Sequence, residues 1–298
     1  MINGVINVYK EKDYTSFDVV AKLRGILKQK KIGHTGTLDP NAEGVLLVCL
    51  GKATKLCDLL TDRDKTYMAT LLLGVETDTE DTTGQVLKES PVEVDEEQVI
   101  QVINSFVGDY MQTPPMYSAI KKDGVKLYEL ARQGIVIERE KRPVTIYNIK
   151  ILSVDLPRVT MEISCGKGTY IRSLCRDIGD KLGTGGCMEK LVRSRACGFD
   201  VQDSLTLDKI DELNQKGEID NYIISIDALY PEYTKVYVKP DCDRFLNNGN
   251  RLDMEDFSHI EENEEKEYCL VYNSKREFCS IYRYLEDEGY YKAYKMFI

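Results

Sequence analysis

The chain has 298 residues, 42% of them hydrophobic, and a formal net charge of −10. A chain of this length and composition is expected to fold as one large or two smaller globular domains around a packed core. It holds no run of about 18 apolar residues, the length that a membrane helix needs, and its first residues lack the pattern of a secretory leader. We therefore expect a cytoplasmic protein without a membrane segment.

The negative charge is concentrated near the C-terminus. Residues 1–199 hold 28 Lys and Arg against 27 Asp and Glu, whereas residues 200–298 hold 12 against 23. Two basic clusters lie in the first part, Lys28–Lys31 and Lys121–Arg142. Local patches rather than net charge bind phosphates, so an RNA-binding role stays open, although such clusters are more often solvated surface.

The nine cysteines indicate neither disulfides nor a metal site. Their number is odd, and no two of them have the C-x-x-C or Cys/His spacing of a zinc site. We expect reduced thiols and no bound metal.

Apolar periodicity and capping residues predict the elements of the first 200 residues. Strands are predicted over Gly4–Tyr9, Val45–Leu50, Thr66–Leu73, Gly84–Leu87, Val144–Leu152 and Val159–Ser164. Helices are predicted from a capping box at Thr15–Asp18 to Gln29, from Asp95 to Phe106, and from Thr169 to Leu182. The last of these would hold Tyr170 and Arg172 in its first turn. Strands and helices without a regular β-α repeat predict an α+β fold.

The pattern changes at the Pro-containing segment Asp227–Tyr233. After it come a short helical stretch to Asn248, the turn NNGN, and two predicted strands, Cys269–Asn273 and Phe278–Leu285. The acidic run Glu261–Glu267 is interpreted as a solvated loop. We therefore predict two domains, residues 1–225 and a small β-rich domain over residues 231–298.

The segment Gly33–Leu46, GHTGTLDPNAEGVL, displays a single carboxylate, Asp39. Its glycines permit positive φ and close approach to a ligand, and Pro40 biases Asp39 away from helical geometry. The apolar strand that follows would support the loop from below. Taken alone, a turn whose Asp makes a local hydrogen bond is the simpler interpretation.

GHTGTLDP followed by NAEGVLLVCLGKATKL resembles the catalytic motif of the TruB family of tRNA pseudouridine synthases. Four further segments fall where that family has them: DKTY (64–67), LGVETDTEDTTG (73–84), MYSAIKKDGVKLYELARQG (116–134) and CGKGTYIRSLCRDIG (165–179). The resemblance covers most of residues 1–225. It implies a mixed-sheet catalytic domain with a thumb insertion at about 112–142. The C-terminal domain more weakly resembles the PUA-like RNA-binding module of the family.

The resemblance implies an enzyme that isomerises the uridine at position 55 in the TΨC arm of tRNA. The reaction detaches uracil from ribose, turns it over and rejoins it through carbon, so the site needs a nucleophile and a proton acceptor at C5. By resemblance Asp39 is the nucleophile, Arg172 pairs with it, and Tyr170 acts at C5 as general base or orients the base. Attack at ribose C1′ and attack at base C6 both remain open. No cofactor or metal is required.

Three more residues are candidates for substrate binding by resemblance. Because a base within folded RNA must be flipped out first, Tyr67 would stack on the uracil and Leu191 would line its pocket. His34 would contact the RNA where the target base is displaced. The implied partner is tRNA through its TΨC stem-loop; no protein partner is implied, and we expect a monomer.

Two other functions compete with this interpretation. A non-catalytic RNA-binding or RNA-folding protein could keep the fold, but the intact set of candidate site residues argues against it. A carboxylate-based glycosidase needs a second acid about 5–9.5 Å from the first. Asp81 and Glu43 are available, but nothing in the sequence pairs either of them with Asp39.

Overall fold

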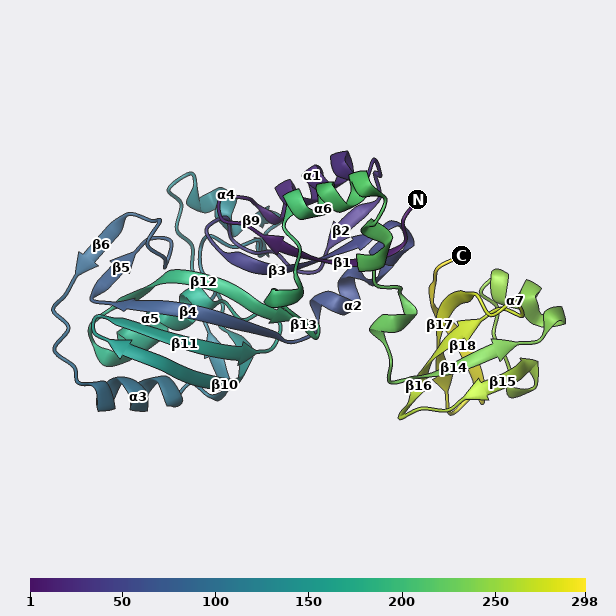
Figure 1. Ribbon diagram of the computed structural model, residues 1–298. Helices are drawn as coiled ribbons and strands as arrows, with labels where there is room; N and C mark the ends of the chain where they lie inside the picture. The colour runs from purple at the N-terminus through teal and green to yellow at the C-terminus, as the bar shows by residue number, and fades with distance from the viewer.

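A nine-stranded mixed sheet is the centre of the larger lobe in the computed structural model, which describes residues 1–298 (Figure 1). Its strands are β1 (Gly4–Lys10), β2 (Ile32–His34), β3 (Glu43–Leu50), β4 (Lys65–Leu73), β7 (Gly108–Gln112), β10 (Arg142–Asp155), β11 (Arg158–Cys165), β12 (Gly186–Ala196) and β13 (Phe199–Asp200). The main path runs β1-β3-β12-β4-β11-β10-β7, with β2 paired to β3 and β13 to β12. The contact between β12 and β3 is parallel.

Burial explains the two strand patterns of this sheet. Alternate residues of β4, from Lys65 to Leu73, are buried. The apolar ones among them pack in one cluster with helices α3 (Glu96–Asn104) and α5 (Ile171–Leu182). β3 is instead buried on both faces, because α1 (Ser16–Ile26) and α6 (Leu207–Lys216) cover one side, while the two short helices of residues 51–61 and then the C-terminal lobe cover the other. A continuous apolar run is typical of a strand covered on both sides.

Both predicted helix starts with capping residues are confirmed. Thr15 caps α1 with Asp18 reaching back, and Asp95 caps α3 with Gln98. The predicted end of the first helix at Gln29 was wrong by three residues, since α1 ends at Ile26 and Lys28 has a φ of 48° that no helix continues through.

Tyr170 does not lie in the first turn of α5 as predicted. The helix begins at Ile171, and Tyr170 is the extended residue before it, with φ −99° and ψ 111°. Arg172 is therefore the second helical residue and Tyr170 the cap position. Gly183, with a φ of 76°, ends the helix.

A two-stranded ribbon, β5 (Val75–Thr77) and β6 (Val86–Glu89), leaves the sheet after β4. The second of these starts two residues later than predicted, because Gly84 still belongs to the turn: a Cβ there would lie 2.3 Å from the Asp78 carboxylate. The thumb region contains the hairpin β8 (Lys121–Lys122) and β9 (Val125–Lys126) and helix α4 (Leu127–Ala131).

The C-terminal lobe is a five-stranded sheet with a short helix, α7 (Asp243–Asn247). Its strands are β14 (Tyr233–Val238), β15 (Phe257–Glu261), β16 (Glu265–Tyr272), β17 (Phe278–Leu285) and β18 (Tyr290–Met296), in the order β15-β14-β16-β17-β18. The two predicted strands are confirmed as β16 and β17. The acidic run Glu261–Glu267 is a loop only over residues 262–264, because β15 and β16 extend into it. An edge strand such as β15 tolerates exposed charged residues, so its sequence lacks the regular apolar pattern that predicts a strand.

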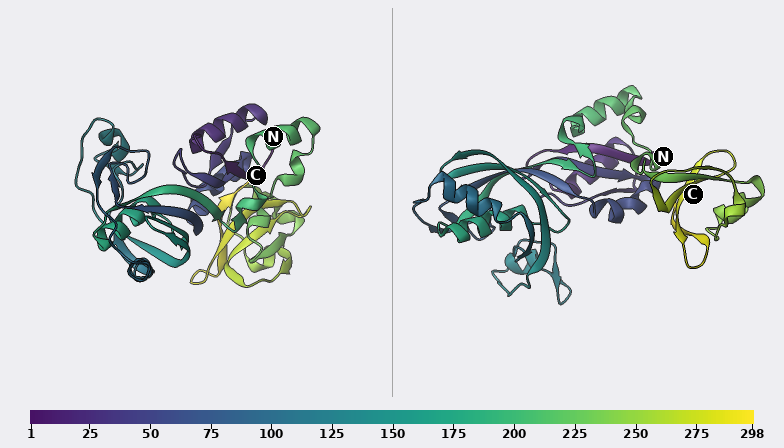
Figure 2. Two further views of the ribbon diagram at one scale, coloured as in Figure 1. Left: turned by 60° about the vertical axis from the view of Figure 1, so that its left-hand side comes forward. Right: turned by 90° about the horizontal axis from the view of Figure 1, so that it is seen from below.

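The two lobes lie side by side (Figure 2), and one hydrophobic cluster joins them. From the larger lobe it takes β3, the short helix η1 (Gly51–Leu56) and α2 (Cys57–Thr61). From the other side it takes the following residues: Ile226, Leu229, Tyr230, Leu270, Tyr272, Ile281 and Phe297. The predicted boundary between residues 225 and 231 thus runs through a shared core, and the division into two independent domains stays a prediction.

All nine cysteines are free thiols. None of the helices is both long and apolar enough to cross a membrane.

We expect Phe297→Ala to destabilise the protein, because this side chain, 3% exposed, fills the core between the lobes. A buried Phe→Ala change costs about 3–5 kcal/mol in the free energy of unfolding. The neighbouring Ile298 is 50% exposed, so Ile298→Ala should stay within about 0.5 kcal/mol of the parent. Urea denaturation followed by circular dichroism measures both. Equal midpoints for the two variants would contradict the shared core.

Candidate active site

The loop that holds Asp39 lies between β2 and β3 and is fixed on both sides of the carboxylate. Leu38 is buried in the cluster that also contains Tyr67 and Leu191, and its backbone N–H donates to the Ser16 hydroxyl at 2.9 Å. On the other side, the Lys10 ammonium donates to the carbonyl oxygens of residues 40 and 42. The Asp39 side chain between these anchors is 33% exposed. The sequence thus builds a rigid loop that presents one acid.

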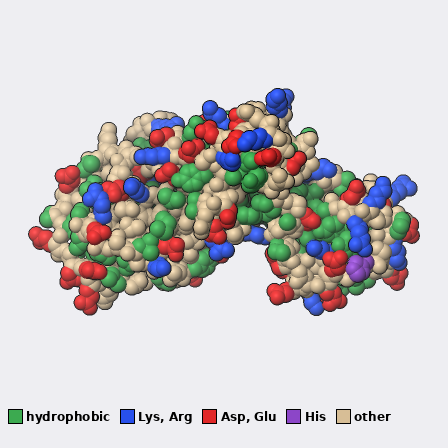
Figure 3. Space-filling model, in the orientation of Figure 1, with side chains coloured by type: hydrophobic (Ala, Val, Ile, Leu, Met, Phe, Trp, Pro, Cys, Tyr) green, Lys and Arg blue, Asp and Glu red, His purple; other side chains and the backbone are tan.

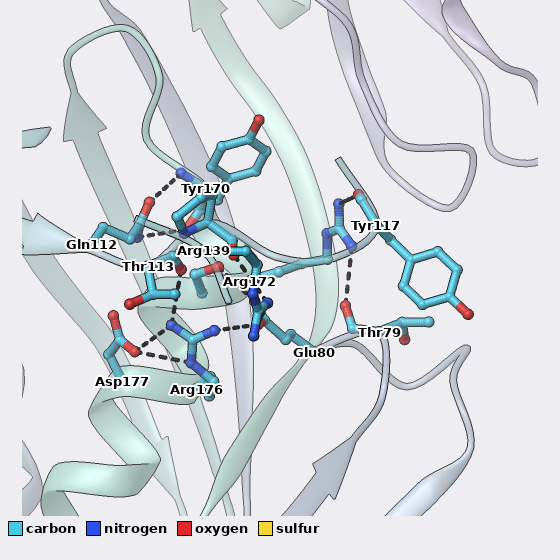
Figure 4. Close-up of polar contacts among 12 residues, drawn as sticks. Thr79, Glu80, Gln112, Thr113, Tyr117, Arg139, Tyr170, Arg172, Arg176 and Asp177 are labelled. Carbon is cyan, nitrogen blue, oxygen red and sulfur yellow. Dashed lines mark hydrogen bonds and ion pairs between the residues drawn. The ribbon is translucent and has the colours of Figure 1, made fainter. Parts of the chain in front are cut away.

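Arg172 binds Asp39 with two parallel contacts. Its Nε lies 2.9 Å from Asp39 Oδ2, and its Nη2 donates to Oδ1 at 3.2 Å. The same guanidinium donates to the carbonyl oxygens of Thr79 and Tyr117, each at 3.0 Å (Figure 4). Its side chain is 5% exposed. One buried arginine therefore joins α5, the Asp39 loop, the turn after β5 and the thumb.

Opposing effects act on the pKa of Asp39. Burial raises this pKa above its ordinary value and is the larger effect, while the Arg172 guanidinium lowers it. The neighbouring Asp81 raises it further. Since a carboxylate nucleophile has to be charged, the pairing with Arg172 is what favours the reactive form in this environment.

Asp81 is the second acid that the sequence could not pair with Asp39. Its Oδ2 lies 3.9 Å from Arg172 Nε, so both carboxylates face the same guanidinium. Its Oδ1 accepts hydrogen bonds from the hydroxyls of Thr79 and Thr83 and from the Thr83 N–H. Donors thus face both oxygens of Asp81, which is not the setting of a glycosidase acid that must hold and deliver a proton.

The two candidate tyrosines come from different elements. The Tyr170 N–H donates to Gln112 Oε1 at 2.9 Å, and its carbonyl oxygen accepts from Gln112 Nε2 at 3.0 Å, which fixes the backbone before α5. Figure 4 shows the Tyr170 ring turned away from Arg139, Arg172 and Arg176. Tyr67, on β4, is 9% exposed. Burial raises the pKa of both phenols, so both are protonated at neutral pH.

His34 and Leu191 come from the strands on either side of this region. Leu191, on β12, is 8% exposed and packs in the cluster of Leu38 and Tyr67. His34 ends β2, and no hydrogen bond or ion pair joins its side chain to the other candidates. Burial lowers its pKa, and the charge of Arg193 lowers it further, so the ring is neutral at pH 7. The structure thus brings Asp39, Arg172, Tyr67 and Leu191 together, and leaves His34 at the start of the loop.

Sequence reasoning missed an ionic cluster that holds the thumb to the catalytic sheet. Glu80, which is 7% exposed, pairs with Arg176, and Arg139 Nη1 lies 3.9 Å from it. Arg176 donates to the Thr113 carbonyl and Arg139 to the Pro114 carbonyl, each at 3.0 Å (Figure 4). Because Arg176 lies one helical turn after Arg172, the two share a helix face, and this spacing was the available signal.

Sequence reasoning also missed Lys10 and Arg193. Both are fully buried cations beside the Asp39 loop. Burial lowers the pKa of Lys10 to about 8. Lys10 ends a mainly apolar strand, and Arg193 lies among other charged residues of β12, so the sequence marks neither of them as buried.

Family models match most of the chain that builds this site. Residues 24–171 match the TruB family pseudouridylate synthase N-terminal domain, and residues 172–230 match the tRNA pseudouridylate synthase B C-terminal domain. The boundary between the two models falls within α5, directly before Arg172.

Whole-chain comparisons agree with these models. The tRNA pseudouridine synthase B of Lachnoclostridium phytofermentans is 52% identical over 100% of both chains. That of Clostridium acetobutylicum is 44% identical over 97% of this chain and 98% of its own. Among solved structures, a chain of a Cbf5-Nop10-Gar1 complex superposes with a TM-score of 0.74 and 26% identity over 99% of this chain and 85% of that one, which confirms the predicted α+β mixed-sheet fold. The chain belongs to the TruB family of tRNA pseudouridine synthases.

Proposed function

We propose that Asp39 is the nucleophile of this tRNA pseudouridine synthase, that its target is the uridine at position 55 in the TΨC arm, and that the reaction needs no cofactor. The observation that supports Asp39 most strongly is its two-contact pairing with the buried Arg172 on a loop that still leaves the carboxylate one-third exposed. We further propose that the enzyme acts as a monomer in the cytosol.

Arg172 has two tasks in this mechanism. Its charge favours the ionised carboxylate, and its planar fork fixes the direction in which the carboxylate oxygens point. Asp39 then attacks either ribose C1′ or base C6, the bond between uracil and ribose breaks, and the base turns before it rejoins through C5. Because the guanidinium also holds Thr79 and Tyr117, the aim of Asp39 depends on three backbone segments.

Tyr67 and Leu191 would form the surface that receives the flipped uracil. Extrusion of a base costs a few kcal/mol, and stacking on an aromatic ring returns about 1–3 kcal/mol. Tyr67, on β4, supplies the ring. Leu191 supplies an apolar neighbour from the adjacent strand β12, where it lies opposite Ala69 of β4. His34, being neutral, would contact the RNA by stacking and not by charge.

The raised pKa of Tyr170 bears on its role at C5. A general base must be deprotonated for part of the time; a phenol at its ordinary pKa is already protonated at neutral pH, and burial raises the pKa of Tyr170 further. Of the two roles that its position allows, the protonated phenol supports orientation of the base through the hydroxyl.

RNA would approach over the thumb. Lys121, Lys122, Arg132, Lys141 and Arg142 are exposed there. In Figure 3 basic side chains also gather along the upper edge of the larger lobe, while acidic ones are frequent on both lobes. A negative chain can bind a polyanion through such patches, and affinity should then fall steeply as salt rises. The rival proposal is a non-catalytic RNA-binding protein on the same fold.

A direct assay separates these two functions. Purified protein is incubated, without added cofactor, with a TΨC stem-loop that is labelled at its uridines. Pseudouridine at position 55 alone supports the proposal. Binding without pseudouridine supports the rival, and pseudouridine at another position contradicts the proposed target.

Asp39→Asn should abolish turnover while the fold and most RNA affinity remain, because the change is nearly isosteric and removes only the nucleophilic charge. Asp13→Asn is the matched control: it is exposed, and its N–H donates to the Pro40 carbonyl of the same loop at 2.8 Å. Single-turnover assays and filter binding with the stem-loop measure both variants. Turnover near the parent rate in Asp39→Asn would refute the assignment.

Arg172→Lys should move the acid limb of the kcat profile to higher pH. Activity needs the Asp39 carboxylate, which is lost as pH falls through its pKa, and Arg172 lowers that pKa. A single ammonium cannot reproduce the fork, so the pKa rises and ionisation requires higher pH. The variant should therefore regain part of its kcat as pH is raised over an interval where the parent changes little. If the kcat profiles of the variant and the parent had their acid limbs at the same pH, the pairing of Arg172 with Asp39 would not control the ionisation of Asp39.

The two tyrosines should respond differently to substitution. Tyr170→Phe keeps the ring and loses the hydroxyl, so kcat should fall much more than RNA affinity. Tyr67→Leu removes a stacking face worth about 1–3 kcal/mol and should impair both. Steady-state kinetics and equilibrium binding on the same stem-loop separate the effects. Full activity of Tyr170→Phe would leave its hydroxyl without a part in the reaction.

A further inference from the structure

Arg193 is a fully buried cation without an acid beside it. It lies on β12, its exposed fraction is 1%, and it is the largest side chain that the fold buries completely. No carboxylate oxygen lies within 4.0 Å of its guanidinium. A buried guanidinium without a counter-charge costs several kcal/mol unless hydrogen bonds compensate. A protein that only needed to fill this space would do so at lower cost with an apolar residue.

The hydrogen bonds that Arg193 donates to the backbone go to the two ends of the Asp39 loop, and its guanidinium also lies against the Tyr67 hydroxyl. Its Nε donates to the carbonyl oxygen of Val45 at 2.6 Å, and its Nη2 donates to the carbonyl oxygen of Gly36 at 3.2 Å. One guanidinium therefore joins residue 36, before the carboxylate, to residue 45, after it. The loop between them contains Asp39.

Close packing leaves little room for this arrangement to change. Gly44 has a φ of 106°, and a Cβ there would lie 2.3 Å from the Arg193 carbonyl oxygen. Gly36, with a φ of 116°, lies beside the guanidinium. Gly44 thus packs against the backbone of β12, and Gly36 packs against the Arg193 side chain. This close packing fixes the distance between the two ends of the loop.

We propose that Arg193 is a positioning residue for the isomerisation, which holds the loop of residues 36–45 at both ends and so aims Asp39. Arg172 acts on the carboxylate itself, whereas Arg193 acts on the backbone that carries it. This inference rests on Asp39 as the nucleophile. Arg193 could instead serve only to fill the core, or could contact an RNA phosphate. The experiments below distinguish these two roles from positioning.

The kinetic test compares Arg193→Gln and Arg193→Lys with Arg195→Gln, a control on the same strand whose side chain is 57% exposed. A displacement of about 1 Å at a reacting group lowers a rate by about 10²-fold. We expect both Arg193 variants to lose about 10²-fold in kcat on the stem-loop with KM within about threefold of the parent, and the control to stay within about twofold in both. A KM increase with unchanged kcat would assign Arg193 to RNA binding and overturn the proposal, as would a kcat near that of the parent.

Amide hydrogen exchange tests the loop directly and without turnover. The N–H groups of Thr35 and Ala42 bond to the carbonyls of Leu47 and Asp39, at 3.0 and 3.1 Å. In Arg193→Lys these two amides should exchange faster than in the parent, while those of β1 should not change. A lower kcat with unchanged loop exchange would overturn the proposal, and so would failure of both Arg193 variants to fold, which would assign the residue to the core. If Asp39→Asn stayed active, the proposed function would fail while faster loop exchange would still show that Arg193 holds the loop.

Discussion

The ion pair between Arg172 and Asp39 is the contact on which the rest of the site depends. An arginine has a planar set of donors, and here that set is shared among a carboxylate and two backbone carbonyls on separate segments. The position of Arg172, second in α5, is fixed by the extended backbone of Tyr170 and its two bonds to Gln112. The start of α5, the thumb and the Asp39 loop therefore depend on one another. A change in any one of them alters the direction of the Asp39 carboxylate.

The charges around the Asp39 loop explain how a protein of net negative charge keeps this acidic site intact. Lys10 and Arg193 are buried beside the loop and donate mainly to its carbonyl oxygens, not to carboxylates. Their charge is thus not cancelled locally, and that of Lys10 lowers the pKa of Asp39. Burial and Asp81 act in the opposite direction. The loop combines a low-polarity setting, which strengthens electrostatic effects and raises the pKa of Asp39, with positive charge that opposes this rise.

The sequence predicted the parts of this protein that local rules govern. Capping residues, alternating strands and the Gly- and Pro-containing loop depend on neighbours in the chain, and these predictions were confirmed apart from small shifts of boundary. The role of Asp81 could not be predicted, because it meets Arg172 only after distant segments of the chain have folded onto the sheet. Arg193 lies on β12, a strand that the sequence analysis did not predict, and among its charged neighbours it gives no signal of its own. The exposed edge strand β15 was missed because its charges resemble those of a loop. The site roles themselves came from resemblance, and the structure adds the geometry that joins these residues.

A structure of Asp39→Asn bound to an unmodified TΨC stem-loop would show directly whether Asp39 faces the reacting uridine, because we expect the variant not to turn over and its side chain keeps the shape of the acid. If Asp39 is the nucleophile, uridine 55 should be flipped out, stack on Tyr67, and bring C1′ or C6 to about 3–3.5 Å from the substituted side chain, as a near-attack geometry requires. Arg172 should still contact that side chain and the Tyr117 carbonyl. A uridine 55 that remained stacked in the RNA, or that lay against a different acid, would contradict the assignment of Asp39 as the nucleophile.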